Sequence, residues 1–305
     1  MNKRNVTNLP ASVHHRLLNL AKETQRPFNE LLQYYTMERF LFRLSHSPFA
    51  DRFVLKGALM LRVWDLSQAR PTMDIDLLGR AANTVENLVE IIRQCLSVEV
   101  AEDGIQFDPG SVLGEPITVE KKYQGVRVRV RGTLGNARLS LQLDFGFGDV
   151  VVPGPVWIDY PQLLDFGPPH LLGYTPESVI AEKFQALVEL ELANTRLKDF
   201  FDLWKLSQTL TFDSEILMQA ITATFKQRGT PLPTTLPLAL TEAFYDDPNR
   251  QAQWNGFLRR GRLEAEAKPL ADIALLIAEF LLPLTQAAAT NSPFKKHWLP
   301  GGNWQ

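Results

Sequence analysis

The sequence predicts an α/β (α+β) fold, in which a lobe with a small mixed sheet is followed by a mostly helical lobe. Apolar and polar residues alternate along two neighbouring segments, residues 126–131 and 139–144, as is typical of paired strands with one buried face. Apolar residues at helical spacing come before this hairpin and dominate the second half of the chain. We therefore expect a sheet lobe with N-terminal helices over residues 1–170, a helical lobe that closes a cleft over residues 171–290, and a tail over residues 291–305.

The composition is that of an ordinary folded protein. The chain has 305 residues and a net charge of -2, enough material for one large domain or two lobes. General nucleic-acid binders are usually basic overall, so any contact with RNA must come from a local patch. Cys95 is the only cysteine, which excludes an intramolecular disulfide and fits a cytoplasmic location.

Hydropathy gives no reason to expect a membrane partner. Residues 1–9 are polar and lack the apolar centre of a signal peptide. The most apolar long run, residues 270–289, is interrupted by Asp272, Glu279 and Pro283. We expect a buried helix there rather than a membrane span.

Two helices are expected before the sheet, over residues 13–24 with Ser12 as cap and over residues 28–45 after Pro27. The second carries many large apolar side chains and would pack on the sheet. The basic residues of both helices form either a solvated face, the simpler interpretation, or a surface for RNA. They are Arg16, Lys22, Arg26, Arg39 and Arg43.

The segment from residue 54 to residue 78 contains the chemistry. It reads as an apolar strand, a turn of small residues at Gly57 and Ala58, a helix, and a second strand that carries Asp74 and Asp76. Side chains alternate along a strand, so both carboxylates project from one face. Two adjacent acids repel each other unless a cation lies between them, and a divalent cation is suited to that place. The alternative is an exposed strand face without a metal.

Three residues near these acids could contact phosphate. Gly57 lets the backbone approach an anion, and the helix that follows favours one. Arg70 precedes the acids, and its guanidinium matches phosphate oxygens in a fixed fork. Lys56 comes before the turn, where it either reaches a phosphate or is an exposed lysine at a strand end.

Between this segment and the helical lobe we expect an amphipathic helix, a loop and a hairpin. The helix covers residues 84–96, and residues 102–120, rich in glycine and proline, are expected to form a loop with at most one short strand. If Gly135 and Asn136 form a two-residue turn, Arg127 lies opposite Asp144.

Lys183 is the clearest anomaly in the helical pattern. Thr175 can cap a helix that opens with Pro176 and runs to about residue 193. Lys183 falls within the apolar arc of this helix, and a buried lysine requires an anion. The anion is either a nucleotide phosphate across the cleft or a carboxylate in a buried ion pair, for instance Asp199.

The next helix separates two acids. On a helical wheel Asp199 lies at the edge of the apolar face, whereas Asp202 shares the opposite face with Lys198 and Lys205 in a predicted surface network. The two acids are therefore expected to face different neighbourhoods. Arg196 and Lys198 are expected near the mouth of the cleft, available to phosphate or to RNA.

These motifs together resemble a known family. The Gly57-small arrangement with Asp74-x-Asp76 is similar to the DNA polymerase β-type nucleotidyltransferase superfamily. The pair Arg70-x-Thr72, the stretch Ala181-Glu-Lys-Phe184 and the stretch Arg196-Leu-Lys-Asp-Phe-Phe-Asp-Leu203 resemble its AbiEii/AbiGii toxin branch, which includes the MenT toxins. The resemblance covers about residues 10–260. Ala58 replaces the serine often found in the superfamily, so a hydroxyl contact to phosphate is absent, and the gap from Ala58 to Asp74 is longer than in the polymerases.

The resemblance implies a polymerase β-like nucleotidyltransferase lobe and a set of roles. Asp74, Asp76 and Asp144 would bind Mg²⁺, although Asp144 could instead only pair with Arg127. The implied catalytic residues are Asp74, Asp76, Lys183 and Asp199. The implied nucleotide-binding residues are Lys56, Gly57, Ala58, Arg70, Lys183, Arg196 and Lys198.

The expected function is that of a toxin of a toxin–antitoxin or phage-defence pair, which transfers a nucleoside monophosphate from an NTP to RNA. The expected acceptor is the 3′ end of tRNA, and the expected partner is an AbiEi-like antitoxin with a DNA-binding domain. One alternative is a nucleotidyltransferase that modifies a protein or a small molecule. Another is a module that binds nucleotide or RNA without turnover, although such a module would not need Lys183 and Asp199 together.

Overall fold

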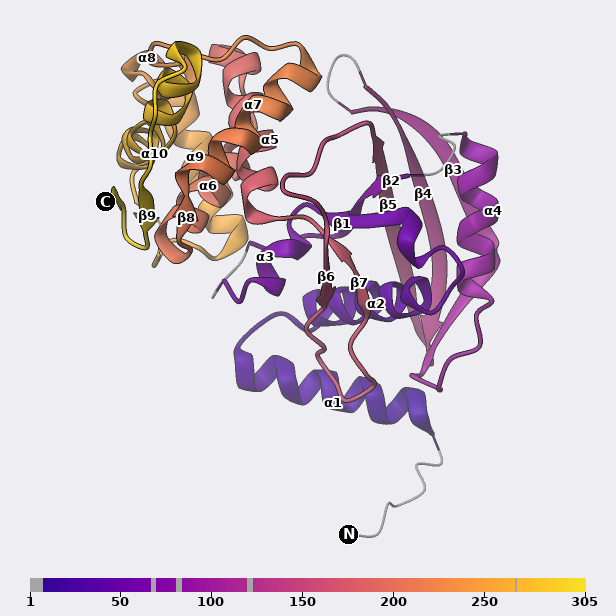
Figure 1. The fold of residues 1–305 in the computed structure, drawn as a ribbon. Coiled ribbons are helices and arrows are strands. Elements are labelled where there is room, and N and C mark those ends of the chain that lie inside the picture. Colours follow the sequence, from indigo (N-terminus) through magenta and orange to yellow (C-terminus); the bar gives the residue numbers. More distant parts are fainter. Residues whose placement is uncertain (1–7, 67–69, 81–83, 120–122, 267) are drawn as a thin grey trace. The chain divides into compact units, whose positions relative to one another are not determined.

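The computed structural model describes residues 8–66, 70–80, 84–119, 123–266 and 268–305 (Figure 1). Its contacts divide the chain into two compact units, each assembled from more than one segment. The first unit consists of Met1–Asp65, Pro71–Gly148 and Val156–Gly173, and the second of Leu66–Arg70, Asp149–Pro155 and Tyr174–Gln305. The domain boundaries expected from the sequence stay a prediction.

The first unit is built on a seven-stranded sheet with the order β3-β4-β5-β2-β1-β7-β6. Strands β2 and β5 are parallel, as are β1 and β7, and the other neighbours are antiparallel. The mixed α/β architecture is confirmed, with a larger sheet than expected. The strands are β1 (Phe53–Lys56), β2 (Asp74–Gly79), β3 (Ile105–Val119), β4 (Tyr123–Leu134), β5 (Ala137–Phe147), β6 (Val156–Asp159) and β7 (His170–Gly173).

The predicted hairpin is confirmed in its register. Strands β4 and β5 close with Leu134 opposite Ala137, so Gly135 and Asn136 form a two-residue turn. Gly135 has a φ of +56°, a conformation that glycine adopts without strain. The same register places Arg127 opposite Asp144.

The prediction of a loop over residues 102–120 is wrong, because most of that segment is strand β3. Its prolines and glycines suggested a break, but β3 lies at the edge of the sheet. An edge strand tolerates proline, whose missing N–H faces solvent. The register shifts between Asp108 and Leu113, and a bulge of this kind absorbs irregular residues without ending the strand.

Helices pack on the sheet of the first unit, and the hydrophobic core lies between the helices and the sheet. Helix α2 packs against β5 and β7, and α4 packs against β3 and β4. Helix α1 begins four residues earlier than expected because Asn8, rather than Ser12, caps it. The helices are α1 (Leu9–Thr24), α2 (Phe28–Ser45), α3 (Leu59–Val63) and α4 (Val85–Leu96).

Two of the basic residues expected on a solvated face are buried instead. Arg39 and Arg43 both contact Asp103, with Nε of Arg39 3.0 Å and Nη1 of Arg43 2.7 Å from its Oδ2. Arg39 also contacts Glu38, which is fully buried, and burial raises the pKa of Glu38 to about 7. A helical wheel misses this cluster because α2 packs on more than one side.

The second unit is mostly helical. Thr175 caps α5 and Pro176 opens it, as predicted, and the helix ends at Leu190 before a 3-10 turn, Glu191–Ala193. Helix α5 packs against α6 and α7, and α10 packs against the same two helices. The helices are α5 (Pro176–Leu190), α6 (Leu197–Thr209), α7 (Ser214–Arg228), α8 (Glu242–Tyr245), α9 (Pro248–Gly261) and α10 (Leu270–Thr290).

The C-terminal residues expected as a tail contribute to a three-stranded sheet. Its order is β10-β9-β8, and Trp298 of β9 is fully buried, with its indole N–H donating to the carbonyl of Ser207 at 2.8 Å. The mixture of cations and aromatics in residues 294–304 did not indicate a strand. The strands are β8 (Phe212–Asp213), β9 (His297–Leu299) and β10 (Asn303–Trp304).

Helix α10 covers the apolar run noted in the sequence. Among the helices in the part of the chain that the structure describes, it alone is long and apolar enough to cross a membrane by those two criteria. Its buried residues recur along its whole length and face α6 and α7. This packing is that of the buried helix expected from the interruptions at Asp272, Glu279 and Pro283.

Candidate active site

The turn after β1 lies against one of the predicted acids. Gly57 has a φ of +72°, and a Cβ added to it would lie 2.1 Å from Oδ2 of Asp76. Glycine is therefore required twice, once for its left-handed backbone and once for the close approach of the carboxylate. Ala58 is buried, and α3 follows as a helix of only five residues.

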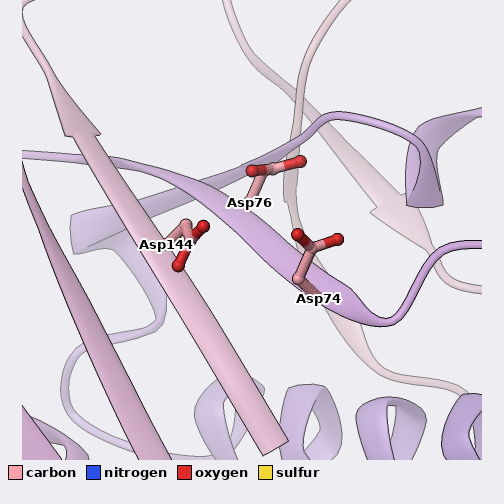
Figure 2. Close-up of side chains that lie close together, drawn as sticks. All are labelled: Asp74, Asp76 and Asp144. Atoms are coloured by element: carbon pink, nitrogen blue, oxygen red, sulfur yellow. The ribbon is translucent and has the colours of Figure 1, made fainter. Parts of the chain in front are cut away.

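The sheet register brings a third acid to the pair on β2. Asp76 is directly opposite Asp144 of β5 and also opposite Lys56 of β1, and Asp74 is opposite Gln142. Residues paired across neighbouring strands share a face, and so do residues two apart along one strand. The three carboxylates therefore project from the same face of the sheet, as Figure 2 shows.

The three acids converge on one small volume. Each of Asp74, Asp76 and Asp144 offers a carboxylate oxygen such that the three atoms lie within 4.8 Å of one another, and all three side chains are partly buried. We call these three residues the carboxylate triad. Like charges at this separation repel each other, and a divalent cation placed between them removes the repulsion.

Neighbouring side chains hold two of the triad carboxylates in place. Asp144 receives two hydrogen bonds from Arg127, 2.8 Å from Nε and 2.7 Å from Nη2, and these bonds raise the pKa of the guanidinium. Asp74 accepts a hydrogen bond of 2.6 Å from the hydroxyl of Thr72. The backbone N–H of Thr72 donates in turn to Tyr34 Oη at 3.2 Å.

The triad has the donor chemistry that a hard divalent cation requires. Mg²⁺ and Ca²⁺ take oxygen ligands, and carboxylates are foremost among them. The salt bridge to Arg127 does not prevent Asp144 from being a ligand, because an ionised carboxylate has about four lone-pair sites and Arg127 uses two. The two interpretations of Asp144 left open by the sequence are therefore compatible.

A second cluster, in the second unit, contains the other predicted residues. Lys183 Nζ lies 2.8 Å from Asp199 Oδ1 and 2.7 Å from Asp202 Oδ2. Arg196 Nε lies 2.6 Å from the other oxygen of Asp199, and Arg70 Nε lies 2.9 Å from Asp202 Oδ1. The five residues form an alternating series of charges, which we call the Lys183 cluster.

The Lys183 cluster corrects the surface network predicted for Asp202. Asp202 is fully buried, as is Asp199, because α6 packs against α5 on one side and against α9 and α10 on others. A helical wheel of α6 alone shows one apolar face and cannot show these additional neighbours. The buried ion pair proposed as an alternative for Lys183 is present, with two carboxylates instead of one.

The cluster keeps its groups ionised. Burial alone would raise the pKa of Asp199, but Lys183 and Arg196 outweigh burial and lower that pKa to about 2. Burial also opposes ionisation of Asp202, yet Arg70 and Lys183 lower its pKa. Burial alone would lower the pKa of Lys183, but the two carboxylates raise it, so the ammonium group stays charged at neutral pH.

Comparison with known proteins agrees with these features. The family model described as "Nucleotidyl transferase AbiEii toxin, Type IV TA system" matches residues 39–276, a span that contains the carboxylate triad and the Lys183 cluster. The chain belongs to the AbiEii nucleotidyl transferase toxin family. It is therefore a nucleotidyltransferase of a type IV toxin–antitoxin system, and membership implies an NTP substrate and an antitoxin partner.

Two crystal structures from Helicobacter pylori are similar to the chain. JHP933 is 17% identical, with a TM-score of 0.49, and the alignment covers 86% of this chain and 96% of that protein. The second protein, described as a candidate nucleotidyltransferase, is 16% identical, with a TM-score of 0.47 and coverage of 86% and 97%. No match was found among the curated proteins.

The structure distributes the AbiEii-like motif residues over the two units. Lys56, Gly57 and Ala58 accompany the carboxylate triad in the first unit, whereas Arg70, Lys183, Asp199 and Arg196 meet in the second. Lys198 is exposed at the start of α6. The catalytic and nucleotide-binding roles assigned to these residues stay a prediction.

Two residues with no role predicted from the sequence support the triad. Thr72 precedes Asp74 by two positions, so the alternation of side chains along an extended segment could have placed its hydroxyl beside that carboxylate. Tyr34 could not have been found in this way, because it lies on α2 and reaches Thr72 only through the packing of that helix. Gln33, next to it, donates to the carbonyl of Met73 at 3.0 Å.

Proposed function

We propose that this AbiEii-family chain transfers a nucleoside monophosphate from an NTP to an RNA acceptor, the 3′ end of tRNA, in a reaction that depends on Mg²⁺. The observation that carries the proposal is the convergence of the carboxylate triad. A divalent cation bound there would stabilise the charge that develops on the α-phosphate and on the leaving pyrophosphate. Magnesium is proposed because it favours carboxylate oxygens together with substrate phosphates.

The chain's own residues prepare the site for the triphosphate. Gly57 has no side chain, so its backbone lies directly beside Asp76. Lys56 places a cation on the face that carries the triad. Arg127 fixes the orientation of Asp144 through two hydrogen bonds. Carboxylates held in advance need no reorganisation when charge develops during the transfer. Arg70 and Lys183 are proposed as further contacts to the triphosphate.

Asp199 is proposed to orient cations rather than to move a proton. Its pKa of about 2 leaves it ionised at neutral pH, so it has no proton to donate. A carboxylate so weakly basic is also a poor general base, since the best catalytic groups titrate near the working pH. Its contacts with Lys183 and Arg196 fix the positions of two cations.

The proposed setting is the cytoplasm, where NTPs and tRNA are present, and the proposed antitoxin is an AbiEi-like protein with a DNA-binding domain. In phage defence, loss of the antitoxin's action would let the toxin modify tRNA and so stop translation. The family supports a toxin and an antitoxin.

A transfer assay tests the function directly. The protein is incubated with Mg²⁺, total RNA and each α-labelled NTP in turn, beside Asp76→Ala and the matched control Asp51→Ala, an exposed aspartate outside the triad. We expect label on a band of tRNA size from the native chain and from Asp51→Ala. Loss of one triad carboxylate should lower the rate by about 10²–10³-fold, by analogy with removal of other preorganised groups.

The outcomes separate the candidate functions. Label that moves to protein or to a small molecule would replace the RNA acceptor with one of those classes. Nucleotide binding without release of pyrophosphate under any condition would favour a binding module. An Asp76→Ala protein that transfers label at the native rate would contradict the role of the triad.

A further inference from the structure

A pocket of about 620 Å³ opens between the start of α6 and one side of α9, within the second unit. Helix α9 is fixed on α6 by aromatic contacts, with the rings of Phe201 and Phe257 5.8 Å apart. Figure 1 shows the two helices in the second unit. The pocket is therefore formed by two helices that pack on each other.

The charged residues that line this pocket are all cations. Arg196 and Lys198 come from the start of α6, and Arg260 comes from the last turn of α9. None of the described residues that line the pocket is acidic. For a chain with a net charge of -2, three cations around one hollow form a local basic site, which is what an RNA contact requires in this protein.

The lining residues on α9 suit a nucleic-acid strand. A Cβ added to Gly256 would lie 3.4 Å from Nη1 of Arg260, so the arginine folds back over the small residue one turn before it. Phe257 offers an aromatic surface on which a base can stack, and Gln253 offers an amide for hydrogen bonds. The lining therefore offers cations for phosphates, an aromatic ring for a base and an amide for hydrogen bonds.

One cation connects the pocket to the Lys183 cluster. Arg196 lines the pocket, and its Nε contacts Asp199 at 2.6 Å. This contact holds the guanidinium group in place, so less side-chain conformational entropy is lost when Arg196 binds a ligand. The fully buried Asp199 holds Arg196 without lining the pocket itself.

The chemistry favours a phosphodiester strand over the triphosphate of the donor. A triphosphate enters a metal-dependent transferase with divalent cations, which require oxygen ligands such as carboxylates. The lining residues that the structure describes include no carboxylate, and the carboxylate triad belongs to the first unit. Backbone phosphates of RNA need only cations and hydrogen-bond donors.

We propose that the pocket lined by Arg196, Lys198 and Arg260 binds the phosphodiester backbone of the RNA acceptor. The inference rests on the proposed function, because it assumes that the acceptor is RNA. It adds the surface that holds the acceptor and assigns Arg196 and Lys198 to RNA rather than to the NTP.

Binding without turnover tests the pocket. In the Asp76→Ala background, without NTP, the affinity for unfractionated tRNA is measured by fluorescence anisotropy at several salt concentrations. Arg260→Glu and Lys198→Glu are each compared with Arg259→Glu, an exposed neighbour on α9 that does not line this pocket. We expect each pocket variant to weaken tRNA binding by about tenfold or more and to reduce its salt dependence, with little change for the control.

Calorimetry of NTP binding completes the test, with the same three charge reversals made in the chain that retains Asp76, and an unchanged NTP affinity is expected. Loss of NTP affinity with tRNA affinity retained would overturn the inference in favour of a donor phosphate site. Equal tRNA affinity in all three variants would contradict RNA binding at the pocket, without contradicting the proposal that the acceptor is RNA. A parent protein that binds no tRNA would overturn the RNA acceptor and the inference together.

Discussion

The molecule contains two groups of aspartates that differ in how their charge is balanced. In the carboxylate triad of the first unit, three partly buried acids converge within 4.8 Å. In the Lys183 cluster of the second unit, two fully buried acids each contact two cations. The first arrangement places three like charges side by side, with Arg127 paired to Asp144, and their mutual repulsion favours a further cation. The second surrounds each acid with two cations.

The comparison shows that the residue type alone does not reveal the role of an acid. An aspartate with two protein cations contributes to stability and fixes those cations. An aspartate that faces other aspartates is available to a metal. The two groups should therefore respond in opposite ways to the same substitution.

The largest contrast is expected from Asp202→Asn and Asp76→Asn. Asp202→Asn leaves Arg70 and Lys183 buried without that carboxylate, and breaking a buried ion pair in this way costs about 3–5 kcal/mol. Asp76→Asn removes a like charge from the triad, so the free energy of unfolding should stay equal or rise. Urea unfolding without divalent cations measures both variants, and equal destabilisation by the two would contradict the comparison.

A smaller effect is expected from pH, and its sign follows from the pKa of Asp199. That pKa is lowered from 3.8 to about 2, so the contribution to stability is present above pH 3.8 and is lost as the pH falls through about 2. At about 1.4 kcal/mol per pKa unit it amounts to roughly 2–3 kcal/mol.

Urea unfolding of the native chain and of Asp199→Asn between pH 2 and pH 6 checks this. The stability difference between them should narrow as the pH falls. A difference that stays constant over the whole range would show that Asp199 does not titrate as an ion-paired acid.

The smallest effect is expected at the edge of the triad, from Thr72→Val. This change removes the hydroxyl that donates to Asp74 at 2.6 Å while keeping the shape of the side chain. A hydrogen bond of this kind contributes about 1 kcal/mol, so the transfer rate should fall by about fivefold. Thr72→Ser keeps the hydroxyl and serves as control, and equal rates for the two variants would exclude a positioning role.

Much of the triad could be predicted because it depends on regular local geometry. Alternation along a strand placed Asp74 and Asp76 on one face, and a two-residue turn at Gly135 placed Arg127 opposite Asp144. Both inferences need only the period of a strand and the length of a turn. The pairing of β2 with β5 joins segments far apart in the sequence, and no local pattern specifies it.

The Lys183 cluster could be predicted only in part. The sequence by itself determined that Lys183 needs an anion, because a lysine within an apolar arc cannot be buried alone. Only the tertiary structure decided which anions it meets, since Asp202 is buried by helices on several sides of α6. Local periodicity determines which face of an element a residue occupies, whereas its charge partners depend on the elements that pack against that face.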